Sequence, residues 1–148
     1  MEDGSFDTVI STQTIEHVED HQGLVNEAYR ILKKGGVFIV SGPLYWHLYE
    51  EPYDFFRFTK HGFSYIMEKS GFEVLKINSN SGSWSTAGQA LIHAIHFSSP
   101  KNFITKNIKK VLYKLKLIYF INIFFKYLDT RDHNDVNTMN YVVVCLKK

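Results

Sequence analysis

The fold is decided by one stretch, residues 5–43, which reads SFDTVISTQTIEHVEDHQGLVNEAYRILKKGGVFIVSGP. It begins with a short apolar run rich in β-branched side chains, residues 6–12, which is typical of a strand. Apolar side chains then recur at helical spacing up to Leu32, and the Lys-Lys-Gly-Gly sequence at 33–36 predicts the end of that helix. Residues 37–40 contain no polar side chain, which favours a parallel strand covered on both faces. The stretch therefore predicts a strand, a crossover helix and a parallel strand, connected in the right-handed sense.

The following segment predicts another helix and strand. Thr59 suits the N-cap of a helix that ends at Gly71, and residues 72–77 predict a strand. Residues 78–88 are polar and rich in Gly and Ser, which predicts a loop, and residues 89–97 have a helical pattern.

Residues 101–127 are basic and strongly apolar. Their most apolar run is shorter than the roughly 20 residues that span a bilayer. The preferred interpretation is a pair of helices that packs over the sheet or the substrate site, and a helix lying on a membrane surface is the alternative. A polar linker, residues 129–138, leads to a last predicted strand, residues 140–146.

The composition is that of one ordinary globular domain. The chain has 148 residues, of which 45% are hydrophobic and 22% charged. Its net charge of +2 does not favour a charge-driven nucleic-acid binder. The single cysteine, Cys145, excludes an internal disulfide and lies in an apolar run, which indicates a buried, inert thiol. His93 and His96 are three residues apart on a predicted helix, but no third ligand is near them in the sequence, so we expect no metal site. The N-terminus is acidic and has no secretory signal, so we expect a cytoplasmic protein.

The motifs of this chain occur in a familiar order. They are Asp3-Gly4-Ser5-Phe6-Asp7, then Ile15-Glu16-His17-Val18, then Leu32-Lys33-Lys34-Gly35-Gly36, then Ser70-Gly71-Phe72-Glu73-Val74, and finally the strand at 141–148. Together they resemble the second half of a class I S-adenosylmethionine (SAM)-dependent methyltransferase of the type 11 group. The resemblance implies an α/β fold with a partial Rossmann-like methyltransferase sheet, made of parallel strands and an antiparallel last strand and flanked by helices.

The resemblance also implies how the chain is divided. We expect one partial methyltransferase domain, residues 1–148, whose sheet core comes from residues 1–80 and 138–148 and whose helical insertion is residues 83–130. The last strand would insert antiparallel, so that the four strands lie in the spatial order first, second, fourth, third.

One half of the resembled domain has no counterpart in this sequence. The family's glycine-rich SAM loop and its ribose-binding acidic residue would both lie before Met1, and no Gly-x-Gly-x-x-Gly pattern occurs in the chain. Gly35 and Gly36 precede a strand, which is the wrong context for a nucleotide loop. We therefore expect a truncated or split methyltransferase, and a separate chain is a candidate source of the missing half. Residues 6–12 would then form an exposed edge strand or the docking site of a partner.

The resemblance places the SAM site at the carboxyl end of the first strand, where open α/β sheets bind their ligands. It implies that Ser11, Thr12 and Gln13 approach the methionine part of SAM and that Glu16 and His17 line the site. His17 is also a candidate catalytic residue. The alternative for the acidic turn is an ordinary helix start, where carboxylates are favourable.

The segment after residue 43 is the candidate acceptor site. Its aromatic side chains suggest a pocket wall, and those assigned to substrate binding are Tyr45, Trp46, Tyr53 and Phe56. Asp54 could act as a base towards a hydroxyl, or Arg57 could bind a carboxylate or phosphate, and an Asp54–Arg57 ion pair that pins the loop is the alternative.

Residues 51–59 resemble a segment of methyltransferases encoded near glycan genes. The predicted function is therefore methyl transfer from SAM to a small-molecule or glycan-linked acceptor. The alternative is a non-catalytic remnant or an interaction module, associated with a membrane surface through residues 101–127.

Overall fold

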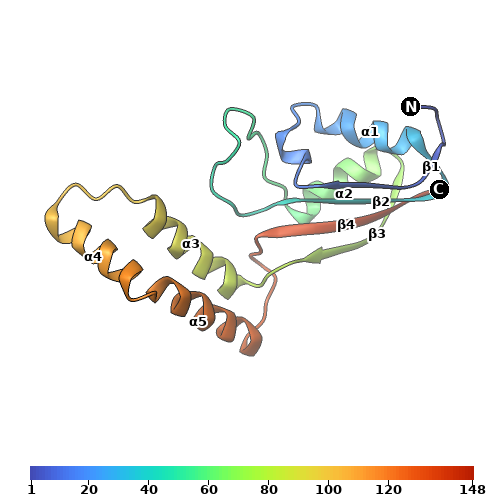
Figure 1. Ribbon diagram of the computed structural model, residues 1–148. Coiled ribbons are helices and arrows are strands. Elements are labelled where there is room, and N and C mark those ends of the chain that lie inside the picture. Colours follow the sequence, from blue (N-terminus) through green and yellow to red (C-terminus); the bar gives the residue numbers. More distant parts are fainter. The chain divides into compact units, whose positions relative to one another are not determined.

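The computed structural model describes residues 1–148, which form two compact units (Figure 1). The first unit contains Met1–Asn80 and Met139–Lys148, and the second contains Ser81–Thr138. The first is a mixed sheet with helices, as the sequence predicts, and the second is helical.

The first unit is built on a four-stranded sheet. Its strands are β1 (Phe6–Thr12), β2 (Leu32–Pro43), β4 (Asn140–Lys147) and β3 (Phe72–Ser79), in this spatial order. β1 and β2 are parallel, and β4 runs antiparallel to both β2 and β3. The predicted order and the antiparallel insertion of the last strand are confirmed, and so is the position of β1 at an edge of the sheet, with most of its residues exposed.

The crossover helix α1 (His21–Ile31) ends earlier than the sequence predicts. The Asp20 side chain caps it by accepting a 2.8 Å hydrogen bond from the Gly23 amide. β2 then begins at once with Leu32, because an extended Leu32 places its side chain in the core, where it is fully buried. Phe6 pairs with Leu32 and Thr8 with Val37, so residues 33–36 form a bulge in β2 rather than the last turn of the helix.

The core of this unit lies on one face of the sheet. Phe38 and Val40 of β2 are fully buried there, together with alternate residues of β4 and the apolar sides of α1 and α2 (Lys60–Lys69). Val37 and Ile39 point to the other face and are only half-buried. The expectation that residues 37–40 are covered on both faces is therefore wrong for the second face, because the helices of this unit pack on the first.

The later elements of the unit agree with the helix and the strand predicted for residues 59–77. Thr59 caps α2 by accepting a 3.0 Å hydrogen bond from Gly62, and Gly71 adopts a φ of +94° after the helix. In β3 the pairing with β4 shifts between Val74 and Lys76, so that Leu75 is 53% exposed. Val74 and Ile77 pack on the core in its place.

The second unit consists of α3 (Ser83–Phe97), α4 (Phe103–Lys114) and α5 (Leu117–Arg131). Figure 1 shows α4 and α5 running in succession back along α3. Gly88 of α3 allows close contact with α5, because a Cβ atom there would lie 2.6 Å from the Cβ atom of Phe125. No helix of the protein is long and apolar enough to cross a membrane.

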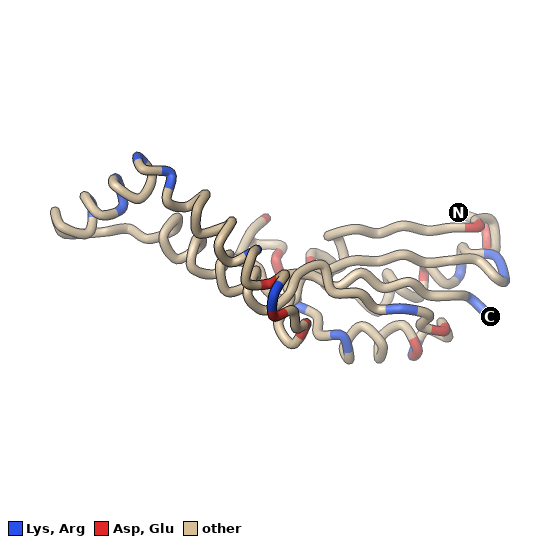
Figure 2. The backbone as a smooth tube through the Cα atoms, turned by 90° about the horizontal axis from the view of Figure 1, so that it is seen from below, with Lys and Arg blue, Asp and Glu red and all other residues tan.

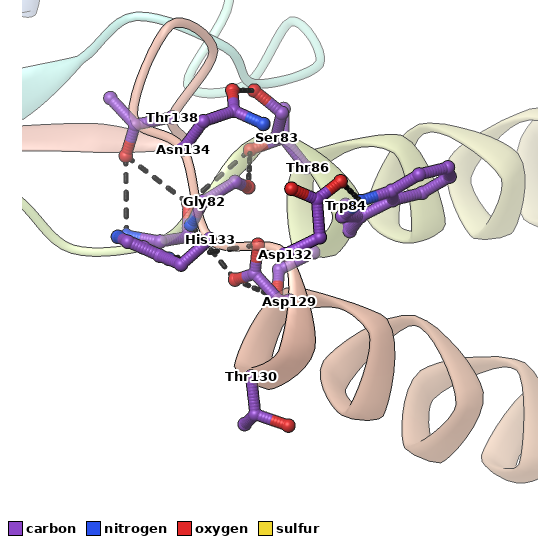
Figure 3. Close-up of polar contacts among 12 residues, drawn as sticks. Gly82, Ser83, Trp84, Thr86, Asp129, Thr130, Asp132, His133, Asn134 and Thr138 are labelled. Atoms are coloured by element: carbon purple, nitrogen blue, oxygen red, sulfur yellow. Dashed lines mark hydrogen bonds and ion pairs between the residues drawn. The ribbon is translucent and has the colours of Figure 1, made fainter.

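Helix α3 begins at Ser83, so the predicted loop over residues 83–88 is wrong. A carboxylate of α5 stabilises its first turn (Figure 3): Asp129 accepts hydrogen bonds from the Gly82 amide at 2.9 Å and the Ser85 hydroxyl at 2.7 Å. The Trp84 indole also donates to Asp132 at 3.1 Å. These contacts join residues more than 40 positions apart, and for this reason the local sequence does not reveal the start of the helix.

Truncation of Phe38 tests the single-faced core. Its side chain is fully buried and its ring stacks on Phe72, with the centroids 5.5 Å apart. We expect Phe38→Ala to lower the free energy of unfolding by about 3–5 kcal/mol in urea denaturation. Phe103, which is 79% exposed, provides the matched control, and Phe103→Ala should change the stability by less than about 1 kcal/mol. Equal losses in the two variants would contradict this packing.

Removal of the Asp129 carboxylate tests the cap of α3. Asp129→Ala leaves the Gly82 amide and the Ser85 hydroxyl without their acceptor. We expect amide hydrogen exchange in the first turn of α3 to accelerate by an amount equivalent to about 1–2 kcal/mol. The exposed Asp135 serves as the control, since Asp135→Ala should leave this exchange unchanged.

Candidate functional site

The turn after β1 joins the carboxyl ends of the two parallel strands. Gln13 has a φ of +49°, and its amide donates to the Ser41 carbonyl at 3.1 Å. Its side-chain amide also donates to the Ser41 hydroxyl at 3.2 Å. A single 3₁₀ turn, Ile15–His17, follows, and there Ile15 and Glu16 are buried. The hydrogen bonds of Gln13 thus hold the end of β1 against the end of β2.

A cavity of about 280 Å³ opens at this end of the sheet. It is lined by Gln13, Trp46, Tyr49 and Asn140. Asn140 begins β4 and pairs with Pro43, the last residue of β2, so the cavity lies at the carboxyl end of the parallel strands. Ligands bind at this edge in open α/β sheets.

One wall of the cavity is held by a buried carboxylate. The Glu16 side chain is fully buried, and one of its oxygens, Oε1, accepts a hydrogen bond from the Tyr49 hydroxyl. Burial raises the pKa of the Tyr49 hydroxyl, and the hydrogen bond to Glu16 raises it further. Tyr49 therefore stays protonated at physiological pH and remains the donor. The second oxygen, Oε2, is buried and has no hydrogen-bond partner.

His17 fastens the 3₁₀ turn to the loop. Its Nδ1 atom lies 2.6 Å from the Tyr53 carbonyl, which can only accept, so Nδ1 carries the proton. In the neutral ring Nε2 then has a free lone pair. Nε2 is buried without a hydrogen bond, 4.0 Å from Glu16 Oε1, and the Tyr49 ring meets the imidazole edge-on at 4.7 Å. His17 does not line the cavity, but its ring contacts that of Tyr49, which does.

The loop after β2 is pinned by the pair formed by Asp54 and Arg57. The guanidinium binds the carboxylate through two hydrogen bonds of 2.6 and 2.8 Å, and the Tyr49 amide donates to the same carboxylate at 2.9 Å. The Arg57 guanidinium lowers the pKa of the Asp54 carboxyl to about 2. Such a carboxylate is a weak base at neutral pH, so these contacts favour the loop-pinning role that the sequence left open.

The remaining predicted site residues lie in different surroundings. Ser11 is half-buried within β1 and Thr12 is exposed at its end. Tyr45 donates its amide to the Met139 carbonyl, whereas the Tyr53 side chain is 63% exposed. Phe56 packs on the core, and its ring lies 4.5 Å from that of His21.

The structure thus brings only part of the predicted set to the cavity. Gln13 and Trp46 line it, while Tyr49 and Asn140 were not assigned to the site from the sequence. Tyr49 belongs to the aromatic run that did suggest a pocket wall, but Asn140 gives no local signal, because only strand pairing brings it to Pro43. No group of three or more His, Cys, Asp or Glu side chains is placed to hold a metal ion.

Sequence comparison finds a family that matches β1, α1 and most of β2. The family described as "Methyltransferase domain" matches residues 1–40. A protein of Mycolicibacterium smegmatis, described as a probable S-adenosylmethionine-dependent methyltransferase, is 46% identical over 43 residues. Residues 1–40 are thus similar to part of a methyltransferase domain.

Solved structures extend the likeness to the whole chain at the level of the fold. A SAM-dependent methyltransferase from Archaeoglobus fulgidus aligns over 99% of the chain with a TM-score of 0.55 and 17% identity. The cyclase SpnF aligns over 99% with a TM-score of 0.54 and 14% identity. The chain spans 62% and 51% of these two structures and 17% of the Mycolicibacterium smegmatis protein.

Loss of the Arg57 guanidinium tests how the loop after β2 is pinned. Arg57→Met should lower the free energy of unfolding at neutral pH by about 2 kcal/mol, because the Asp54 carboxylate loses its partner. The folded pKa of Asp54 lies below its ordinary value, so this contribution is present above about pH 4 and is lost as the pH falls towards 2.

Urea denaturation at several pH values measures the difference from the wild type. The difference should shrink between about pH 4 and pH 2. The control is Arg131→Met, which removes an exposed guanidinium from α5 and should show no change of this kind. A difference that does not vary with pH would refute the assignment.

Proposed function

We propose that the protein acts as a SAM-dependent methyltransferase, or as part of one, on a small-molecule or glycan-linked acceptor. The observation that carries the proposal is the cavity formed by Gln13, Trp46, Tyr49 and Asn140. It lies at the carboxyl ends of β1 and β2, next to the segment that matches methyltransferase domains. The cyclase SpnF has a similar fold, so the fold alone does not determine the reaction, which depends on the residues of the site.

The residues of the cavity fit the amino-acid part of SAM. Trp46 and Tyr49 offer aromatic surfaces, which attract a cation such as a sulfonium or ammonium group. Gln13 and Asn140 add polar side chains that suit the carboxylate and the amine. When bound, SAM supplies a methyl group that its sulfonium already activates. A cavity of about 280 Å³ is smaller than most complete ligand sites, so the nucleoside part would need further residues.

The chain's own contribution is to position the groups and exclude water. Glu16 fixes the Tyr49 ring through the hydroxyl, and the Asp54–Arg57 pair holds the loop that carries Tyr49. Methyl transfer depends mainly on alignment of the reacting groups, which a rigid loop provides. His17 is the candidate proton acceptor for an acceptor hydroxyl or amine, because Nδ1 donates to the Tyr53 carbonyl and Nε2 makes no hydrogen bond.

An uncovered face and an open edge support a further layer of structure. Ile10 of β1 is 65% exposed, and Val37 and Ile39 of β2 are half-buried on the face that lacks α1 and α2. The outer edge of β1 has no neighbouring strand. Such surfaces are normally covered in native proteins. The proposal therefore includes a further segment, from a longer form of the chain or from a separate chain, that pairs with β1 and supplies the rest of the SAM site.

Calorimetry with SAM tests this function. It compares the chain alone with the chain joined to, or mixed with, the product of the coding sequence immediately upstream. We expect the affinity for SAM to be at least about tenfold higher in the assembly. Trp46→Leu should weaken SAM binding by the assembly about tenfold, because it removes an aromatic wall of the cavity.

The matched control for Trp46 is an aromatic side chain of the same loop that does not line the cavity. Phe55→Leu meets this condition and should leave the affinity unchanged. Absence of SAM binding in the assembly, or equal effects of the two substitutions, would reject the proposed site.

A further inference from the structure

Helix α5 has two apolar sides, and only one of them is packed. Phe125 lies against Gly88 of α3 on the inner side. The outer side carries an aromatic stripe at helical spacing, formed by Tyr119, Phe120, Ile123, Phe124 and Tyr127. These side chains are between 47% and 62% exposed. An exposed stripe of this size on a helix is expected only where something else covers it.

Helix α4 carries an apolar stripe of its own and adds positive charge. Ile104, Ile108, Val111 and Leu115 follow one another at spacings of three and four residues and are between 49% and 69% exposed. Lys106, Lys110 and Lys114 form a neighbouring row, also exposed. Neither α4 nor α5 contains a buried residue. The apolar side chains of both helices are thus available to a partner.

The charge of this region has a single sign. Residues 101–128 contain seven Lys and no Asp or Glu, although the whole chain has a net charge of only +2. Figure 2 shows the blue Lys positions on α4, with no red position among them. Lys109 is used internally, since its ammonium group donates to the carbonyls of His96 and Ser98 at the end of α3. The other six Lys have no acidic partner within this segment.

Two hollows of different character lie on α4. One, of about 550 Å³, is lined by Ser99, Pro100, Lys106, Lys109, Lys110 and Tyr113. The other, of about 400 Å³, is lined by Phe103, Ile104, Asn107, Ile108, Val111 and Leu112. The helix thus offers both basic and apolar side chains, and an anionic phospholipid presents the matching combination of a negative headgroup and hydrocarbon chains.

We propose that α4 and α5 bind the surface of an anionic phospholipid bilayer. Phe120, Phe124 and the stripe of α4 enter the boundary between headgroups and acyl chains, and the Lys row contacts the phosphates. Tyr119 and Tyr127 suit that boundary, because their rings are apolar and their hydroxyls remain in water. Charge complementarity selects this occupant: a second copy of the chain would bring the same positive charge to the interface. The inference goes beyond methyl transfer and does not depend on it.

Vesicle flotation of the full chain tests the proposal. The vesicles contain phosphatidylcholine alone or phosphatidylcholine with phosphatidylserine. We expect binding to the anionic vesicles at low salt, weaker binding at high salt, and little binding to phosphatidylcholine alone. A variant that combines Lys106→Glu, Lys110→Glu and Lys114→Glu should lose binding by at least about a hundredfold. A second variant, with Phe120→Ser and Phe124→Ser, should lose binding at both salt concentrations.

A charge-matched control separates the helical surface from net charge. Lys34→Glu, Lys60→Glu and Lys76→Glu change three exposed Lys of the first unit by the same total charge and should leave most of the binding intact. Circular dichroism should show that each variant keeps its helices.

Three results would overturn the proposal. The first is no flotation with either vesicle at low salt, and the second is equal loss of binding in the two triple-Lys variants. The third is a concentration-dependent dimer in sedimentation velocity that is disrupted by Phe120→Ser and Phe124→Ser, together with no lipid binding, which would assign the stripe to a second copy of the chain.

Discussion

The pairing of β2 on both of its edges is the constraint on which the rest of the first unit depends. β1 pairs with it in parallel and β4 pairs antiparallel on the other side. The buried side chains of Phe38 and Val40 hold β2 against α1 and α2. The same pairing decides what meets at the carboxyl end of the strand: Gln13 bonds to Ser41, and Asn140 lies opposite Pro43. The candidate site is therefore a direct consequence of strand register.

The loop beside that site is held by polar contacts rather than by a large apolar core. A buried Glu16 carboxylate is costly unless it is hydrogen-bonded, and the Tyr49 hydroxyl supplies one such bond. The bidentate pair of Asp54 and Arg57 also binds the loop backbone. The guanidinium donates to the His47 carbonyl, and the carboxylate accepts from the Tyr49 amide. Contacts of this kind specify one geometry, because each has a required direction. This rigidity agrees with the proposed role of the loop, which is to align the reacting groups for methyl transfer.

The two units expose apolar surfaces that differ in charge and therefore suit different partners. In the first, Ile10 and Ile39 lie on a sheet face without helices, which fits a partner made of folded protein. In the second, the aromatic stripe of α5 and the Lys row of α4 combine exposed rings with unbalanced positive charge, which fits a lipid surface. The overall composition, 45% hydrophobic with a net charge of +2, therefore does not reveal these two surfaces, one apolar and one both apolar and basic.

The sequence by itself determined the elements whose signals are local. The apolar run of β1, the cap of α2 at Thr59 and the antiparallel last strand follow from side-chain type, spacing and family resemblance. Tertiary structure alone decided where Leu32 turns from helix to strand, that α3 begins at Ser83, and that Asn140 joins the cavity. The burial of Leu32 decides the first, the Asp129 carboxylate stabilises the start of α3, and the register of β4 brings Asn140 to Pro43. Each depends on groups distant in sequence, which local propensity cannot report.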